Sequence, residues 1–241
     1  MKNLEGQIAI VTGASSGIGA ASARALAEAG ATLVLVARRA DRLTALADEL
    51  GRGSTAYAAD MADPDAPQRL HDFVLGRFSR ADILVNNAGM LHAAPIDAFD
   101  LDQLRPMIAI NYEAVVRAST LFARTMKAAG KGQIINISSI GANITAPGVG
   151  VYGGLKRALE AFTDCLRVEL AGSGVKVGIV APGTTSTEIF EDMKARGQPS
   201  WDSFIPPMQP RDIAEAVAVI AQQSERTNIA RIQVYAAADS H

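Results

Sequence analysis

A phenol and an ammonium group stand four residues apart in the segment Tyr152-Gly-Gly-Leu-Lys156. On a helix, side chains with this spacing lie on one face, one turn apart. An unperturbed phenol loses its proton only at about pH 10, which makes it a weak acid-base group at neutral pH. A nearby cation favours the phenolate and is expected to bring its pKa toward neutrality. The pair therefore predicts a group that exchanges a proton with a bound molecule.

A glycine-rich turn lies near the start of the chain, where Gly13, Gly17 and Gly19 fall between an apolar run and a helical pattern. A side chain at these positions would block a tight turn, the close approach of a phosphate, or helix–sheet packing. The backbone amides that open such a helix face a pyrophosphate, aided by the helix dipole. The spacing G-x-x-x-G-x-G differs from the common G-x-G-x-x-G fingerprint, but its position between a strand and a helix indicates a dinucleotide site.

The second apolar run ends in Val36-Ala37-Arg38-Arg39. An acidic residue at Ala37 would accept hydrogen bonds from the ribose hydroxyls of NAD, and none is present. Arginine suits a 2′-phosphate, because its charge is permanent and its donors form a fork. The alternative is that both arginines open the next helix in solvent. We expect NADP(H) as cofactor and, with the tyrosine–lysine pair, a carbonyl–alcohol oxidoreductase.

Apolar runs rich in β-branched residues alternate with amphipathic stretches of helical length. The expected strands are Ile8–Val11, Thr32–Val36, Ser54–Ala58, Ile83–Val85, Ile134–Ile137, Val175–Val180 and Ile229–Tyr235. The expected helices are Gly17–Ala29, Asp41–Leu50, Ala66–Arg77, Leu101–Ala129, Val151–Ala171 and Arg211–Gln222. Most of the strands lack a polar face, as is typical of strands covered on both sides. The pattern predicts an α/β protein, a single-domain Rossmann fold over residues 1–241 with a doubly wound, seven-stranded parallel sheet flanked by helices.

One stretch departs from this alternation. Thr187–Pro210 holds four of the ten prolines, and Glu188–Arg196 has the pattern of a short helix. In an open α/β sheet, ligands bind beyond the carboxyl ends of the strands, so this insertion is expected to form a substrate lid at 187–210. The alternative is a surface excursion packed by Trp201 and Phe204.

Composition narrows the possible partners. The chain has 241 residues, of which 49% are apolar, and a net charge of −2 without any basic block. Nucleic acid and anionic membranes are therefore not expected as partners, and no apolar stretch is long enough to span a bilayer. Cys165 is the only cysteine, which indicates a reducing, cytoplasmic setting. The three histidines have no paired spacing, so no metal site is expected. The expected partner is therefore a small-molecule substrate.

The motifs follow the order and spacing of the short-chain dehydrogenase/reductase family, which the chain resembles over essentially its full length. The segments that carry this resemblance are Thr12–Gly19, Asp60, Asn86-Asn87-Ala88-Gly89, Asn111, Ser139, the Tyr152/Lys156 pair, Pro182-Gly183 and Thr187.

The resemblance implies four catalytic residues. Ser139 and the phenol of Tyr152 would hold the substrate oxygen, and Tyr152 would supply its proton. Lys156 would bind the nicotinamide ribose and place positive charge near the phenol, while Asn111 would link Lys156 to a proton relay through a water. Ser138 competes with Ser139 for its role, but the spacing to Tyr152 favours Ser139.

The resemblance also implies the residues that contact the cofactor. They are Gly13, Ser15, Ser16, Gly17, Ile18, Gly19, Ala37, Arg38, Arg39, Asp60, Met61, Asn87, Ala88, Gly89, Tyr152, Lys156, Pro182, Gly183, Thr185 and Thr187. Asp60 would accept a hydrogen bond from the adenine amino group, and Thr187 would meet the carboxamide or the diphosphate. The second basic residue often present in the glycine turn of NADP enzymes is replaced here by Ser16, which places more weight on Arg38.

Three further expectations follow from the resemblance. The function is an NADPH-dependent interconversion of a carbonyl and an alcohol, with the late motifs similar to clavulanate-type aldehyde reductases and serine-type hydroxy-acid dehydrogenases. The alternatives are a 3-oxoacyl-carrier-protein reductase and a non-catalytic NADP-binding sensor or scaffold. The assembly is a homotetramer, or at least a homodimer, built on the helices Leu101–Ala129 and Val151–Ala171.

Overall fold

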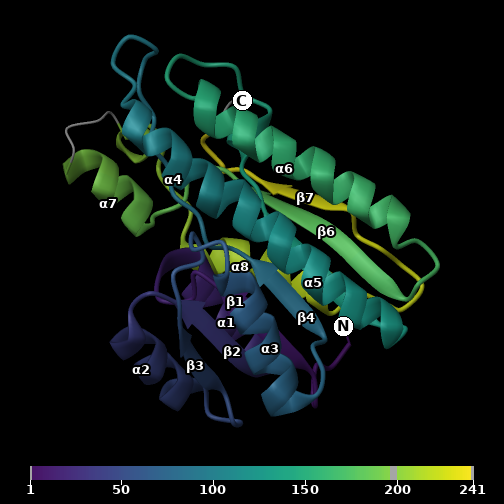
Figure 1. Cartoon of the computed structure of the whole chain (residues 1–241). Coiled ribbons are helices and arrows are strands. Elements are labelled where there is room, and N and C mark those ends of the chain that lie inside the picture. The colour runs from purple at the N-terminus through teal and green to yellow at the C-terminus, as the bar shows by residue number, and fades with distance from the viewer. Residues whose placement is uncertain (1, 196–199, 240–241) are drawn as a thin grey trace.

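Seven parallel strands form the centre of the molecule (Figure 1). A computed structural model describes residues 2–195 and 200–239. The strands lie in the order β3-β2-β1-β4-β5-β6-β7. Their bounds are β1 Ile8–Thr12, β2 Thr32–Ala37, β3 Thr55–Ala58, β4 Ile83–Asn86, β5 Gly132–Ile137, β6 Val175–Pro182 and β7 Arg231–Val234. The predicted seven-stranded parallel sheet and doubly wound α/β fold are confirmed.

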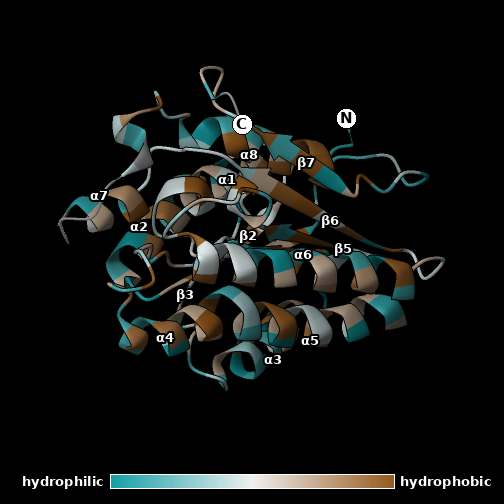
Figure 2. Cartoon of the chain, turned by 90° about the horizontal axis from the view of Figure 1, so that it is seen from above, coloured by the Kyte–Doolittle hydropathy of each residue, from teal (hydrophilic) through white to brown (hydrophobic). Residues whose placement is uncertain are grey.

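Helices cover both faces of this sheet (Figures 1 and 2). One layer consists of α1 Gly17–Glu28, α2 Ala40–Leu50 and α8 Pro210–Ala221. The other consists of α3 Ala66–Phe78, α5 Ala114–Ala128 and α6 Gly150–Glu169. Successive strand residues point to opposite faces, so Ala9 and Val11 pack under the first layer while Ile8 and Ile10 pack under the second. This two-sided burial is why the strands read as continuous apolar runs.

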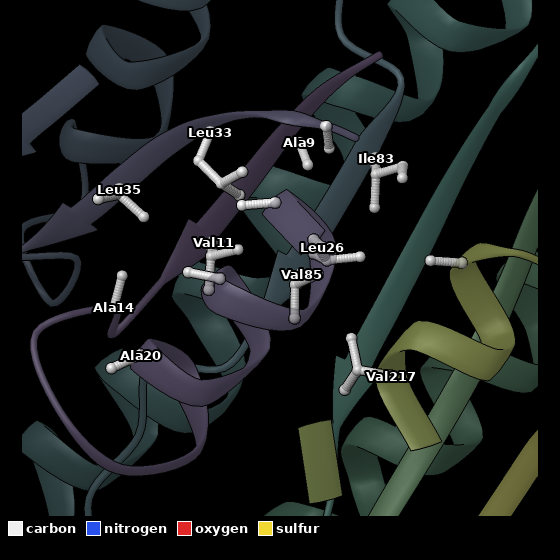
Figure 3. Packing of buried hydrophobic residues seen from close by; sticks show 14 of the residues in the cluster. Ala9, Val11, Ala14, Ala20, Leu26, Leu33, Leu35, Ile83, Val85 and Val217 are labelled. Carbon is white, nitrogen blue, oxygen red and sulfur yellow. The ribbon is translucent and has the colours of Figure 1, made fainter. Parts of the chain in front are cut away.

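The first layer packs tightly because its contact residues are small or branched. Figure 3 shows Ala20 and Leu26 of α1 and Val217 of α8 near the strand residues Val11 and Val85. The close approach brings α1 and α8 into direct contact on the same face. The amino end of α1, which carries the glycine turn, is thereby fixed relative to the sheet.

The expected helix Leu101–Ala129 forms as one unbroken helical segment, but it is not α-helical throughout. It consists of a 3-10 turn Leu101–Gln103, α4 Leu104–Ile108, a π-helical turn Ala109–Glu113 and then α5. A π turn inserts extra backbone into a helix without ending it, and such turns are frequent at functional sites. Here it contains Asn111, whose side chain is fully buried. The 3.6-residue apolar pattern survives the insertion, which is why the sequence indicated one helix.

A chain of buried polar side chains connects the two middle strands to the helices above them. The amide of Asn86 on β4 donates to Asn136 on β5 over 2.8 Å and to Ser119 on α5 over 3.0 Å. The amide of Asn136 donates in turn to Thr163 on α6 over 2.9 Å. All four side chains are buried, and these bonds satisfy the amide donors that burial would otherwise leave without partners.

The sheet reverses its winding direction at β1, because β2 lies on one side of it and β4 on the other. Crossover connections then leave opposite faces, and a crevice opens beyond the carboxyl ends of the strands. Within the part of the chain that the structure describes, no helix is both long and apolar enough to cross a membrane. The same residues contain no group of three or more potential metal ligands.

Candidate active site

The glycine turn after β1 requires the absence of side chains. Gly13 and Gly17 have φ angles of +69° and +52°, a conformation that other residues rarely adopt. A Cβ on Gly19 would lie 2.2 Å from the carbonyl oxygen of Gly13, so the first turn of α1 packs directly on the loop. A cavity beyond the carboxyl ends of the strands is lined by the other residues expected to contact the cofactor, but not by Gly19. Its role is to allow this packing.

Asn87 and Thr12 connect the loops after β1 and β4. The Thr12 hydroxyl accepts hydrogen bonds from the backbone amides of Asn87 and Ala88, each over 3.0 Å. The Asn87 amide donates back to the carbonyl of Thr12 over 2.9 Å. These three hydrogen bonds fix the loop after β1 to the loop after β4, next to the strand at which the sheet reverses its winding direction. Thr12 lies inside the predicted motif, but sequence reasoning assigned it no contact.

Asn111 anchors the segment that follows β4. Its side-chain amide donates to the carbonyls of Met90 over 2.8 Å and Met107 over 3.0 Å, and its oxygen accepts from the backbone amide of Met90 over 3.3 Å. A Cβ on Gly89 would lie 2.8 Å from the Asn111 oxygen and 3.8 Å from the Lys156 nitrogen. The π turn thus brings Asn111 close to the ammonium, with Gly89 between them.

Lys156 extends from α6 toward the end of β5 and is only 5% exposed. Its ammonium donates to the carbonyl oxygen of Ile137, at the end of β5, over 2.9 Å. Burial lowers the pKa of this ammonium from 10.5 to about 8, and the carboxylate of Glu160 works in the opposite direction. Lys156 therefore remains a cation at neutral pH but releases its proton more readily than a surface lysine.

Tyr152 lies one helical turn before Lys156, and the ammonium is 5.8 Å from the centre of its ring. A Cβ on Gly141 would lie 3.3 Å from the Ser139 oxygen and 3.5 Å from Cε1 of Tyr152, so both side chains border this glycine. Burial raises the pKa of the phenol to about 12, and the Ser139 hydroxyl lowers it by less. The expected fall in the phenol pKa is therefore wrong, because loss of hydration outweighs the other influences on this pKa.

One cavity of about 950 Å³ joins these groups to the glycine turn. All the predicted catalytic and cofactor-contacting residues except Gly19 line it. They comprise Gly13, Ser15, Ser16, Gly17, Ile18, Ala37, Arg38, Arg39, Asp60, Met61, Asn87, Ala88, Gly89, Asn111, Ser139, Tyr152, Lys156, Pro182, Gly183, Thr185 and Thr187. Ser138 also lines it, but its hydroxyl donates to the buried carboxylate of Glu160 over 2.9 Å.

Arg39, rather than Arg38, makes the contacts at the far end of the cavity. Its guanidinium donates to the hydroxyls of Ser15 and Ser16, with both Nη2 distances at 2.9 Å, and Arg38 is exposed at the rim. Nη2 also lies 2.8 Å from the carboxylate of Glu188, the first residue of α7 Glu188–Ala195. The glycine turn is thus linked through one arginine to the segment expected to act as a lid.

Glu188 is a site residue that sequence reasoning missed. Its second oxygen accepts from Nη1 of Arg42 on α2 over 2.5 Å, and Figure 2 shows α7 near α2. The Arg39 contact, with help from Arg42 and Ser16, lowers the pKa of the carboxyl to about 2. Its only sequence signal was its position directly after Thr187. Arg39 and Arg42, which it bridges, lie 146 or more residues before Glu188 in the sequence, so no local pattern connects them with it.

The apolar side of α7 closes the other end of the cavity. Phe190 and Met193 pack with Ala93 and Leu91 of the segment after β4. Thr185 pairs with Met208 in an isolated parallel bridge, which ties the two ends of the 187–210 insertion to each other. Residues 196–199 of the expected lid lie outside the described residues.

The cavity lies at the carboxyl ends of six strands, β1 to β6, and joins a glycine turn to a Ser–Tyr–Lys group. This arrangement defines a dinucleotide-dependent oxidoreductase on a Rossmann fold. The sequence profile of the short chain dehydrogenase family matches residues 7–197, and the chain belongs to that family. It is therefore an oxidoreductase that acts on alcohol or carbonyl groups.

Known relatives align over nearly the full length. Sulfoacetaldehyde reductase 2 of Chromohalobacter salexigens is 36% identical, covering 94% of this chain and 93% of the relative. A probable NADP-dependent dehydrogenase of Haemophilus influenzae is 35% identical, and the alignment covers 96% of this chain and 94% of the relative. Among solved structures, a metagenomic short-chain oxidoreductase in complex with NADP is similar with a TM-score of 0.83 and 33% identity, covering 97% and 99%.

Proposed function

We propose that this protein uses NADPH to reduce the carbonyl group of a small molecule to an alcohol, or carries out the reverse reaction. The observation that carries the proposal is one continuous cavity lined by the glycine turn, Arg39, Ser139, Tyr152 and Lys156. A Cβ on Gly13 or Gly19 would meet Asn87 or the Gly13 carbonyl at 2.7 Å or less, so these glycines let the turn pack closely against the loop after β4. Gly13 and Gly17 line the cavity, where the backbone amides that open α1 can face a phosphate. The residues present fit a dinucleotide.

Arg39 supports NADP(H) over NAD(H). Its guanidinium lies beside Ser15 and Ser16 at the end of β2, where the adenosine ribose would reach. A permanent charge with forked donors matches a 2′-phosphate. Arg38 stands beside it at the rim and adds positive charge. A solved relative in complex with NADP and a relative named as NADP-dependent agree with this assignment.

When bound, the cofactor supplies hydride to the carbonyl carbon. The Ser139 hydroxyl donates a hydrogen bond to the carbonyl oxygen, on which negative charge develops. The Tyr152 phenol, protonated at neutral pH because burial raises its pKa, donates its proton to that oxygen. Lys156, with its lowered pKa, stabilises the resulting phenolate and binds the nearby ribose hydroxyls. Asn111 positions the Met90 segment beside Lys156 through two hydrogen bonds to the Met90 backbone, and a third bond joins it to the Met107 carbonyl.

The proposed assembly is a homotetramer, or at least a homodimer, in the cytoplasm. The outward side of α6 carries an apolar stripe, in which Ala161, Cys165 and Val168 are exposed and Phe162 is partly exposed. Leu101, before α4, is exposed as well. A two-fold contact would bury each such surface against its own copy. The single cysteine fits a reducing compartment.

Replacing Tyr152 with Phe tests the reaction. A general acid contributes about 10²- to 10⁴-fold, so kcat should fall by that factor, while NADPH should bind with nearly unchanged affinity because the ring remains. Fluorescence titration measures binding and loss of reduced-nicotinamide absorbance measures turnover. Tyr57→Phe is the control, since Tyr57 stacks on Phe73 away from the cavity. Substantial turnover by Tyr152→Phe would contradict the assignment of the proton donor.

A further inference from the structure

The two ends of the cavity differ in charge. Among the described residues that line it, the basic side chains are Arg38, Arg39 and Lys156. Arg38 and Arg39 follow β2, whereas Ser139 follows β5. Three strand spacings separate β2 from β5, which amounts to about 14 Å. The arginines therefore lie beyond the reach of a small substrate whose carbonyl is held at Ser139.

Lys156 is the basic side chain near Ser139, and it is already engaged. Its ammonium donates to Ile137 and lies over the Tyr152 ring, at the base of the cavity rather than at its wall. In the proposed reaction its remaining donors face the ribose and the phenolate. A carboxylate or sulfonate elsewhere on the substrate would not reach this charge without displacing those partners.

The wall around the substrate end is apolar. It is formed by the segment between Ser139 and Tyr152, the segment after β4, and Ile189, Phe190 and Ile205 of the 187–210 insertion. The apolar side chains that line it are Met90, Leu91, Ile140, Ile144, Ala146, Val149, Ile189, Phe190 and Ile205. The acidic side chain of Glu191, on the same helix as Phe190, also lines the cavity and repels an anion.

We propose that the substrate is an uncharged carbonyl compound with an apolar substituent, and that carbonyl compounds bearing a carboxylate or sulfonate are rejected. This inference rests on the proposed function and concerns the same cavity. An anionic group placed against this wall loses its hydration and meets no cation among the described residues that form the wall, which is strongly unfavourable. The specificity thus differs from that named for the sulfoacetaldehyde reductase relative, because sulfoacetaldehyde carries a sulfonate.

A matched pair of aldehydes tests this specificity. Methyl 4-oxobutanoate and 4-oxobutanoate share the same reacting group and chain length, but only the second is an anion at neutral pH. With NADPH in excess, kcat/KM should be at least about 30-fold higher for the ester, a factor typical of a buried charge without a partner. An equal or higher kcat/KM for the acid would overturn the proposal.

A change in the wall provides the converse test. Ile144 is partly exposed and lines the cavity, so it tolerates a longer side chain. Ile144→Arg should raise kcat/KM for 4-oxobutanoate and narrow the ratio at least about tenfold, because the guanidinium pairs with the carboxylate. Ile144→Gln, which is polar but uncharged, is the control and should leave the preference for the ester. If the two variants change the ratio equally, charge does not set the specificity.

A binding measurement separates this inference from the proposed function. Absence of turnover with both aldehydes would count against the function but would not decide the specificity. Ligand-observed NMR with NADPH-saturated Tyr152→Phe protein then compares binding of the same two compounds. Tighter binding of the ester supports an uncharged substrate, and equal or tighter binding of the acid refutes it.

Discussion

Removing the carboxylate of Glu188 is expected to strengthen the binding of NADPH but not of NADH. This carboxylate bridges Arg39 at 2.8 Å and Arg42 at 2.5 Å. Its pKa of about 2 keeps it ionised at every pH at which the protein would be assayed. A 2′-phosphate that approaches Arg39 must compete with it. Glu188→Gln removes this competing charge, whereas NADH has no 2′-phosphate to benefit.

The size of the effect follows from exposure. The Arg39 and Glu188 side chains are 38% and 39% exposed, so water screens their pair. Ion pairs this exposed contribute about 0.2–1 kcal/mol each, so removal of the competitor should tighten NADPH binding by up to about fivefold. The gain should shrink in high salt, because mobile ions screen the same charges.

Fluorescence titration of NADPH and NADH measures the two dissociation constants. Glu169→Gln is the matched control, because Glu169 is an exposed residue at the far end of α6 and its loss changes the net charge equally. An unchanged or weaker NADPH affinity in Glu188→Gln would refute the reasoning. So would an equal gain for both cofactors, since the effect would then not depend on the 2′-phosphate.

Two further predictions concern stability and assembly. Lys156→Met should be inactive yet more stable at pH 7: a pKa lowered from 10.5 to about 8 corresponds to about 3 kcal/mol of buried-charge cost, reduced by about 1 for the lost bond to Ile137. Lys156 binds its proton more tightly in the unfolded than in the folded protein, so the stability of the wild type rises between pH 8 and 10.5. Urea denaturation at pH 7 and pH 10 should therefore show a smaller difference in unfolding free energy between variant and wild type at the higher pH. A difference that does not change with pH would contradict this. Val168→Glu should dissociate the oligomer in light scattering, because Val168 is 64% exposed on α6, whereas Phe162 packs partly on its own sheet; a wild-type monomer would refute the assembly.

The sheet was predictable because burial on both faces leaves a direct signal in the sequence. Each expected strand overlaps the observed one, and the ends differ by a few residues, as in β7, which covers only Arg231–Val234 of the expected Ile229–Tyr235. The π turn at Asn111 was not predictable, because it changes hydrogen bonding without interrupting the apolar pattern. The spacing of apolar residues along the chain thus predicts which helices and strands form, but it does not predict the hydrogen-bond geometry within them.

The cavity was predictable to the extent that its residues lie in motifs. The glycine turn and the Tyr152/Lys156 pair could be recognised because their spacing is local. The bridge from Glu188 to Arg39 and Arg42 could not, because it depends on where the start of α7 lies relative to α2 and the end of β2. The direction of the phenol pKa was also beyond the sequence, since it depends on how much water reaches Tyr152.

The buried chain from Ser119 through Asn86 and Asn136 to Thr163 also bears on how the protein finds its fold. Parallel strands that are apolar on both faces can slide past one another with little loss of hydrophobic contact. A one-residue slip of β4 against β5 would turn Asn86 and Asn136 to opposite faces and leave their amides unbonded in a dry interior. These hydrogen bonds therefore favour one register of β4 against β5 during folding. A shifted register would keep much of the aliphatic packing but would lose the hydrogen bonds of the buried amides.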